Sequence, residues 1–412
     1  MSSGAQTGVV GWAAALLLLA APAWAQPSGL ALTEAEVARL AAENPGVAAA
    51  TEARRTAAEA RARAAGARPA IELELLREAG DGLSGEGTQD SARFRYPLDI
   101  GGVRGAERRG GLARREAELA AIETGSAARA ATARRLFHEA AALARRAALR
   151  RSLAERLGGL ESAVRRRVDE GDAAQLDLRR IEAEAEAARI ATVRLEAESA
   201  AKWTELQGIL GPSSSTFAPP SAIPAAPPLE PLDTYLDRAA AAPDARRMGA
   251  ETRAAELQAE ALARRAGVPQ TALVAGLRSV DDRMGRTTGV IAGAVVSLPL
   301  NAGPRAQAEA QAAEARALRA DQGLAETARR SAVIAAWSLA ERLSRAAATP
   351  PPRPEAVLEP AEAAYLGGEI ETADLIAAHR AAAEAASARI DLEQEAALAR
   401  VRLDELVGKT AP

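Results

Sequence analysis

The chain has 412 residues with 52 basic and 55 acidic side chains, which gives a formal net charge of −3. Cysteine is absent, which excludes disulfide-stapled scaffolds, thiolate zinc sites and thiol catalysis. So weak a net charge provides no global attraction for nucleic acid. Aromatic residues make up 2% of a chain that is 48% hydrophobic, so they cannot fill a thick core. Abundant alanine, glutamate, arginine and leucine are instead typical of long helices packed through thin seams.

Residues 1–25 predict a secretory signal. They carry no charged side chain, they include the apolar run Trp12–Ala21, and Ala23 and Ala25 are small residues suited to cleavage after Ala25. A membrane anchor is the alternative, but the run is about half of the ~20 residues that a spanning helix needs. No cysteine follows the cleavage point, so N-terminal lipidation there is excluded. We expect an exported bacterial protein of the periplasm or outer membrane.

The remainder of the chain reads as two repeats. Gly171 and Gly368 are each followed by an Asp-Leu pair six residues later, and each stretch ends in a further glycine forty residues on. Upstream, Pro97-Leu98 precedes a glycine pair much as Pro299-Leu300 precedes Gly303. Alanine-rich sequence that aligns easily with itself is the rival explanation. We predict a signal peptide at 1–25, a first repeat at 26–211, a Pro/Ser-rich linker at 212–231 and a second repeat at 232–408.

In the first repeat, residues 33–66 predict an amphipathic helix that Thr33 and Glu36 open as a capping box. Period-two alternation near residues 71–75 and 91–98 predicts two strands, separated by a polar, glycine-rich loop at 80–90. Residues 103–167 predict a helix roughly 100 Å long. A turn at 169–171 then leads to a return helix at about 174–210.

The second repeat follows the same plan. We predict a helix at 232–266, strands near 270–280 and 288–299 around a loop at 281–287, a helix at 305–348, and a helix at 372–407 after a turn at Gly367-Gly368. Thr349–Pro354 contains four prolines and interrupts the long helix, because proline removes a helical hydrogen bond and clashes with the preceding turn. The second hairpin is therefore expected to bend or lose helical structure before its end.

The strands have one face suited to lipid. Two hairpins alone are too few for a stable sheet, whereas strands of about ten residues with one apolar face suit a transmembrane barrel. A barrel must close, so several subunits would have to share it. The predicted membrane-facing side chains are Ile71, Leu73, Leu75, Phe94 and Tyr96, and the opposite face carries Glu72, Glu74, Arg93 and Arg95, which line the lumen or are merely solvated. Soluble hairpins packed on a helical bundle are the alternative.

Four segments together resemble the TolC family of outer-membrane efflux factors, over roughly residues 30–408. They are Tyr96–Gly102 with Arg104, its counterpart Val296–Gly303, the turn Val168–Gly171 with Asp177-Leu178, and the turn Tyr365–Gly368 with Asp374-Leu375. Within the family, the sequence at Gly276–Arg278 and Ser297–Leu300 most resembles the branch paired with heavy-metal cation pumps.

The resemblance implies a mainly α fold with a small β part, in which duplicated long helical hairpins and four transmembrane strands form a trimeric α/β-barrel tunnel. It implies a homotrimer in outer-membrane lipid with a periplasmic helical tunnel. This would be a passive duct for substrates that an inner-membrane pump delivers through a periplasmic adaptor, and the heavy-metal branch implies a pump of the RND type. The implied adaptor-docking tips are Val168, Asp169, Glu170, Gly171, Tyr365, Leu366, Gly367 and Gly368. Asp177 and Asp374 are the implied aperture acids.

Simpler interpretations of these residues stay open. One is that Gly171 and Gly368 do no more than allow the chain to turn. Another is that Asp177 and Asp374 do no more than stabilise the positive ends of helix dipoles. A type I secretion channel, a periplasmic adaptor and a soluble coiled-coil protein without a pore are the alternative functions.

We find no catalytic, phosphate-binding or metal-ligand pattern in the sequence, so we expect no enzyme activity, no cofactor, no metal site and no nucleic-acid partner. His138 and His379 are expected to be packing or surface residues.

Overall fold

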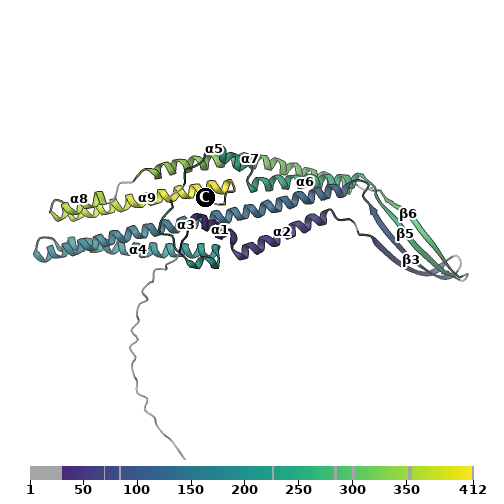
Figure 1. Cartoon of the computed structure of the whole chain (residues 1–412), viewed down its shortest axis with the longest axis horizontal. Helices are drawn as coiled ribbons and strands as arrows, with labels where there is room; N and C mark the ends of the chain where they lie inside the picture. The colour runs from purple at the N-terminus through teal and green to yellow at the C-terminus, as the bar shows by residue number, and fades with distance from the viewer. Residues whose placement is uncertain are drawn as a thin grey trace, which may run out of the picture.

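A computed structural model describes residues 30–68, 70–82, 85–224, 227–282, 285–298, 302–350 and 355–410. The predicted signal segment at 1–25 and the prolines at 351–354 lie outside these residues. The described chain is an elongated body of long helices with a four-stranded sheet at one end and two helical hairpin ends at the other (Figure 1). The predicted fold class, mainly α with a small β part, is confirmed.

The two halves have the same order of elements. The first contains α1 (Glu34–Glu43), α2 (Pro45–Ala65), β2 (Glu72–Gly82), β3 (Gly85–Leu98), α3 (Val103–Glu170) and α4 (Gln175–Leu210). The second contains α5 (Leu232–Ala240), α6 (Pro243–Gly267), β5 (Gln270–Asp282), β6 (Gly285–Ser297), α7 (Gly303–Ala348), α8 (Glu355–Leu366) and α9 (Thr372–Leu406). Two short strands, β1 (Leu30–Ala31) and β4 (Phe217–Ala218), pair in parallel beside the 3-10 helix η1 (Pro212–Thr216).

The helices expected at 33–66 and 232–266 are each broken in two, which corrects those predictions. Pro45 and Pro243 are the first residues of α2 and α6, the position where a missing backbone N–H is tolerated. At the first break, the side chain of Asn44 accepts a hydrogen bond from the Gly46 N–H at 3.1 Å. The predicted capping box is confirmed, since the Glu36 N–H donates to Thr33 Oγ1 at 3.2 Å and the Thr33 N–H donates to Glu36 Oε2 at 2.8 Å.

The strands are longer than predicted, so the expected loops at 80–90 and 281–287 are wrong in their bounds. The ladder continues to the pairs Gly82–Gly85 and Asp282–Gly285. Backbone groups pair whatever the polarity of the side chains, so polar and glycine-rich residues extended these strands where the sequence pattern suggested a loop. The sheet order is β2-β3-β5-β6 and every pairing is antiparallel.

Each short helix covers one long hairpin. In the first half, Val37 and Leu40 of α1 pack on Phe137 of α3 and on Trp203 and Leu206 of α4. In the second half, Tyr235 of α5 packs on Val333 of α7 and Leu403 of α9. A third cluster of large side chains lies near the hairpin ends, and between these clusters many of the buried residues of the helices are alanines, as the composition predicts.

The second hairpin is interrupted where the prolines predicted a break. The helix α7 ends at Ala348 and α8 begins at Glu355. Arg389 of α9 donates from Nη1 to the carbonyl oxygens of Thr349 at 2.9 Å and Ala346 at 3.3 Å, and from Nη2 to that of Ala347. The guanidinium therefore satisfies carbonyl groups that lose their helical partners at the end of α7.

Candidate functional site

One face of the sheet is apolar and exposed. Directly paired residues lie on the same face, and the register joins Leu75 to Ala92, Ala92 to Leu277 and Leu277 to Val290. Leu75 and Val290 are 72% and 80% exposed. The exposed large side chains that this register places on the face are Leu73, Leu75, Phe94, Tyr96, Leu273, Leu277, Val290 and Val296. Ile71, directly before β2, is also exposed.

Near the helices, the opposite face carries the charged residues of β2 and β3, whereas further along the strands the charged Arg77 lies on the apolar face. Glu72 pairs with Arg95 and Glu74 with Arg93 across these strands. The Glu72 and Arg95 charges lie 3.9 Å apart, which is a weak, exposed ion pair. The part of the sheet near the helices therefore has one apolar and one charged face, and neither is covered by another element of the described chain. This is the arrangement of a sheet with lipid on one side and water on the other.

The sheet edges are open in the single chain. Each of β2 and β6 has one neighbouring strand, because the order β2-β3-β5-β6 ends with them. Long unpaired edges beside an apolar face expose backbone N–H and C=O groups that lipid cannot satisfy. The single chain is therefore incomplete as a membrane structure.

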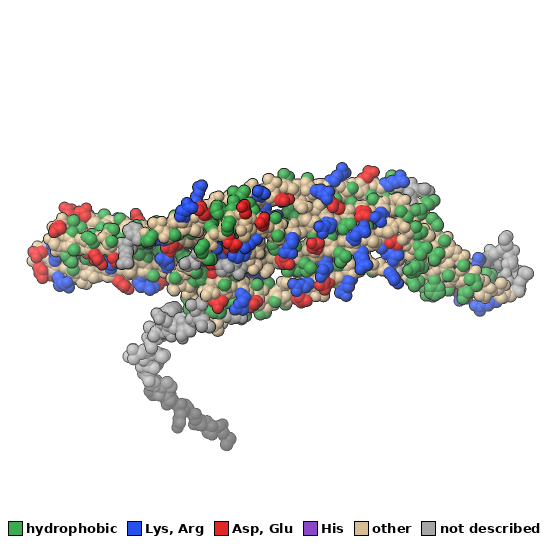
Figure 2. Space-filling view, turned by 45° about the horizontal axis from the view of Figure 1, so that its top comes forward, with side chains coloured by type: hydrophobic (Ala, Val, Ile, Leu, Met, Phe, Trp, Pro, Cys, Tyr) green, Lys and Arg blue, Asp and Glu red, His purple; other side chains and the backbone are tan. Residues whose placement is uncertain are grey.

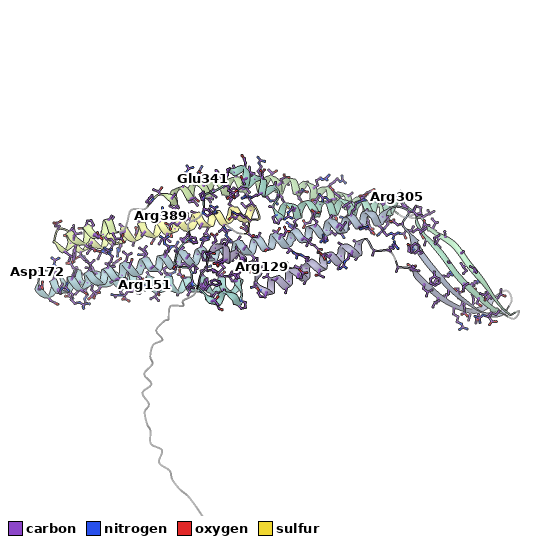
Figure 3. The ribbon with its side chains drawn as sticks, in the orientation of Figure 1. Arg129, Arg151, Asp172, Arg305, Glu341 and Arg389 are labelled. Atoms are coloured by element: carbon purple, nitrogen blue, oxygen red, sulfur yellow. The ribbon has the colours of Figure 1, made fainter. Side chains whose placement is uncertain are left out.

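The hairpin ends share one turn geometry. Gly171 and Gly368 adopt φ angles of 85° and 76°, the left-handed region that favours glycine. After each, the next N–H reaches five residues back: Asp172 N donates to Arg167 O and Glu369 N donates to Ala364 O, both at 2.8 Å. Asp172 marks this end of the molecule in Figure 3. Among the predicted docking residues, Asp169, Glu170, Gly171, Leu366, Gly367 and Gly368 are exposed.

The two hairpin ends contact each other through Tyr365. Its side chain is buried and packs with Leu160 and Val164 of α3 and Leu375 of α9. Arg167 Nη1 donates to the Tyr365 carbonyl oxygen at 3.2 Å, and its guanidinium lies 5.8 Å from the centre of the tyrosine ring. Tyr365 and the half-buried Val168 therefore hold the two hairpins together in this chain, and only the exposed members of the predicted docking set remain available to a partner.

The two predicted aperture acids lie at helix starts. Asp177 is in the first turn of α4, with Oδ1 3.8 Å from Arg180 Nη1. Asp374 forms a capping box with Glu371, whose N–H donates to its carboxylate at 3.4 Å. These contacts favour the dipole interpretation, and a role at an aperture stays a prediction.

A buried charge cluster joins the two halves, and sequence reasoning missed it. Arg134 of α3 is fully buried; its Nε donates to Glu34 Oε1 of α1 and its Nη2 to Asp404 Oδ2 of α9, both at 2.7 Å. His138 Nε2 lies 3.2 Å from the same Glu34 oxygen. The spacing of the residues could have indicated this burial. Arg134 lies at a helical interval on the apolar side of α3, whose other members are Ala127, Ala130, Phe137 and Ala141.

His379 lies buried between the hairpins near their ends. Its Nε2 is 3.2 Å from Glu362 Oε1 of α8, and Arg156 of α3 donates from Nε to the same oxygen at 3.2 Å. Burial lowers the pKa of His379, the Arg156 charge lowers it further, and the attraction of Glu362 and of Glu184 on α4 does not compensate. The folded environment therefore disfavours the charged form of the imidazole.

This gives a pH prediction for the hairpin ends. The folded pKa lies below the ordinary value of 6.5, so the unfolded chain binds the proton more readily and stability falls as the pH decreases below about 6.5. Thermal unfolding of the wild type and of the His379→Gln variant measures this contribution. It is monitored by circular dichroism over a pH series that ends about one unit below the ordinary histidine pKa, at about pH 5.5. The melting temperature of the variant should fall less over that range. An identical fall in both proteins would contradict the prediction.

Within the described ranges, no group of three or more His, Asp or Glu side chains is arranged to hold a metal ion. In the same part of the chain, no helix combines the length and the apolar character needed to cross a bilayer.

No protein-family model and no curated protein matches the sequence. Solved structures do match the fold. A membrane protein from Pseudomonas aeruginosa superimposes with a TM-score of 0.75 and 19% identity, over 92% of this chain and 91% of that one. The outer-membrane channel OprN gives 0.74 and 18%, over 91% and 90%. The chain has the fold of an outer-membrane channel.

A third match is CusC, whose structures concern folding and transmembrane channel formation, with a TM-score of 0.70 and 17% identity over 92% of each chain. The long helical hairpins and the small sheet implied by the resemblance to the TolC family are thereby confirmed as the fold of the chain, and the trimer and the closed barrel stay predictions. The matched structures are described as channels and membrane proteins, in keeping with the absence of a catalytic pattern in the sequence.

Proposed function

We propose that this chain is the outer-membrane duct of a tripartite efflux system. The main support is the four-stranded sheet at one end of the long helical body, with its exposed apolar face and its two open edges. The chain also matches an outer-membrane channel over about nine-tenths of its length. Three copies would supply twelve strands, so that β6 of one copy pairs with β2 of the next and no edge meets lipid. The helical bodies would then enclose a tunnel through the periplasm.

The apolar sheet face sets the orientation of this duct. It would face lipid, while Glu72, Glu74, Arg93 and Arg95 would face the lumen. The hairpin ends would lie about the length of α3 away, at the periplasmic end (Figure 1). A channel of this kind has no energy source of its own, so export would be driven by an inner-membrane pump and coupled through a periplasmic adaptor that binds the hairpin ends.

Envelope fractionation tests the duct. The full chain, expressed in a Gram-negative host, should co-purify with the outer membrane, require detergent for extraction and have a native mass of about three chains. The purified particle should also conduct ions across a planar bilayer. A monomer released without detergent would rule out the duct and leave the strands as soluble hairpins.

A single exposed side chain tests adaptor docking. Leu366 is 51% exposed at the second hairpin end, whereas its neighbour Tyr365 is buried. Leu366→Glu should weaken adaptor binding by about tenfold or more, because a charge replaces apolar contact area at the centre of the proposed interface. The control is the native mass of the variant, which should remain that of the wild type, and unchanged adaptor binding would exclude this end as the docking site.

For the cargo, metal cations are the first class to test. The segments Gly276–Arg278 and Ser297–Leu300 carry the resemblance to the branch paired with heavy-metal cation pumps, and CusC is among the channels with the same fold. Loss of the protein should then lower the tolerance of its host to copper, silver or zinc salts. Unchanged tolerance to all of them would exclude this cargo class and leave the duct itself untouched.

A further inference from the structure

Charge is distributed unevenly along the molecule. Residues 355–384, at the end of the second hairpin, carry seven acidic side chains and one basic one, Arg380. Basic side chains instead gather over the helices beside the sheet, next to its apolar surface (Figure 2). Arg305 marks this junction and Asp172 the opposite end (Figure 3). The near-neutral net charge therefore hides a basic end and an acidic end.

A groove at the basic end lies between the last turns of α2 and the first turns of α3. It has a volume of about 460 Å³ and is lined by Glu59, Ala62, Arg63, Gly66, Arg108, Leu112 and Arg115. Residues 108, 112 and 115 are spaced by four and three, so they lie on one side of α3. Leu112 is 51% exposed in the groove. The lining thus combines cationic heads with an apolar floor.

Two of the groove arginines have no acidic partner. Arg115 pairs with Glu59 at 3.2 Å. Within the described ranges Arg108 forms no ion pair, and Arg63 has only a long contact, 3.5 Å, from Nε to its own helix at Glu59 O. The absence of a side chain at Gly66 leaves room for Arg108, because a Cβ there would lie 2.9 Å from the Arg108 Cγ. The groove therefore keeps a net positive charge with two guanidinium groups free to bind an anion.

Its place in the fold indicates the ligand. The helix α3 begins five residues after β3 ends, and Arg108 lies roughly 8 Å into that helix. On the other wall, β2 begins nine residues after Arg63. The groove therefore lies just beyond the apolar sheet face, at the level where a bilayer that covers this face would place its headgroups. Guanidinium groups bind phosphate through paired hydrogen bonds, so the two free arginines of the groove suit a lipid phosphate at this level.

We propose that this groove binds the phosphate of an anionic phospholipid in the leaflet that faces the helical body. This inference rests on the proposed membrane location of the sheet. Arg63 and Arg108 hold the phosphate, and the acyl chains extend from it towards the apolar sheet face. Arg68, exposed in the short segment between α2 and β2, adds positive charge at the entrance.

Native mass spectrometry of the full chain in a mild nonionic detergent tests the site. Dioleoylphosphatidylglycerol and dioleoylphosphatidylcholine are added in equal amounts, and their adducts on the particle are compared. The wild type should prefer the anionic lipid, and Arg63→Gln with Arg108→Gln should reduce that preference by about fivefold for each arginine. Arg54→Gln is the matched control, because Arg54 is exposed on α2 nine residues further from the sheet.

The outcomes separate this inference from the proposed function. A trimer that binds both lipids equally, or a double variant that keeps the preference, overturns the lipid site and leaves the duct standing. A double variant that falls apart into monomers identifies the groove as a subunit contact and also overturns the site. A wild-type particle that is monomeric without detergent overturns the duct and, with it, this inference.

Discussion

Replacing Arg134 by methionine is expected to lower the free energy of unfolding by about 3–5 kcal/mol. The guanidinium of Arg134 compensates two carboxylates, Glu34 and Asp404, and Asp404 is fully buried. Methionine has a similar volume, so little cavity is created. The loss comes from a buried Asp404 charge left without its cation.

Urea unfolding of the full chain in detergent, followed by circular dichroism at 222 nm, measures the change. Arg135→Met is the matched control, because Arg135 is the next residue of α3 and is exposed, so its replacement should alter stability by less than about 0.5 kcal/mol. Adding Asp404→Leu to Arg134→Met removes the uncompensated charge and should recover part of the loss. Equal stability of the Arg134 and Arg135 variants would show that the cluster contributes nothing to the fold.

The same cluster predicts loss of stability in acid. Burial alone would raise the pKa of Glu34, but the hydrogen bond and charge of His138 and those of Arg134 lower it from 4.5 to about 2. A depressed carboxylate pKa adds stability above the unfolded value, and that contribution is lost as the pH falls from about 4.5 towards 2. The shift corresponds to about 3 kcal/mol, and Glu34→Gln should abolish this part of the acid dependence.

Leu75→Arg is expected to abolish assembly in the outer membrane. Leu75 is 72% exposed on the apolar face of β2, where a bilayer would cover it. An arginine on the lipid face of a transmembrane strand costs about 2–4 kcal/mol near the bilayer midplane, and three copies would each bear this cost in one particle. The amount of protein recovered in the outer-membrane fraction, and its native mass, measure the effect.

The neighbouring residue is the matched control. Leu76 has the same side chain but points to the opposite face, where it pairs with Ser91 opposite Arg278. Leu76→Arg should therefore assemble nearly normally, because water and polar groups are available on that face. If both variants assemble equally, the apolar face does not meet lipid and the sheet is a soluble one.

Much of the helical architecture follows from local rules. Long runs without a breaker, the capping box at Thr33 and the glycines at 171 and 368 predicted helix ends that lie within about three residues of those observed. The breaks before Pro45 and Pro243 were missed, although proline at a first helical position was there to indicate them. Alternation identified the apolar members of β2 and β3, but not where these strands end, because backbone pairing does not depend on side-chain polarity.

The sequence by itself determined which segments are helical, which strand residues share a face and where the hairpins turn, because these depend on neighbours within a few positions. Only the tertiary structure decided that β3 pairs with β5, that Arg134 meets Asp404 across 270 positions, that Tyr365 is buried between the hairpins and that Arg63 and Arg108 line one groove. Each of these depends on how distant helices and strands pack, and a helix periodicity shows which side of a helix is apolar without showing what will cover it.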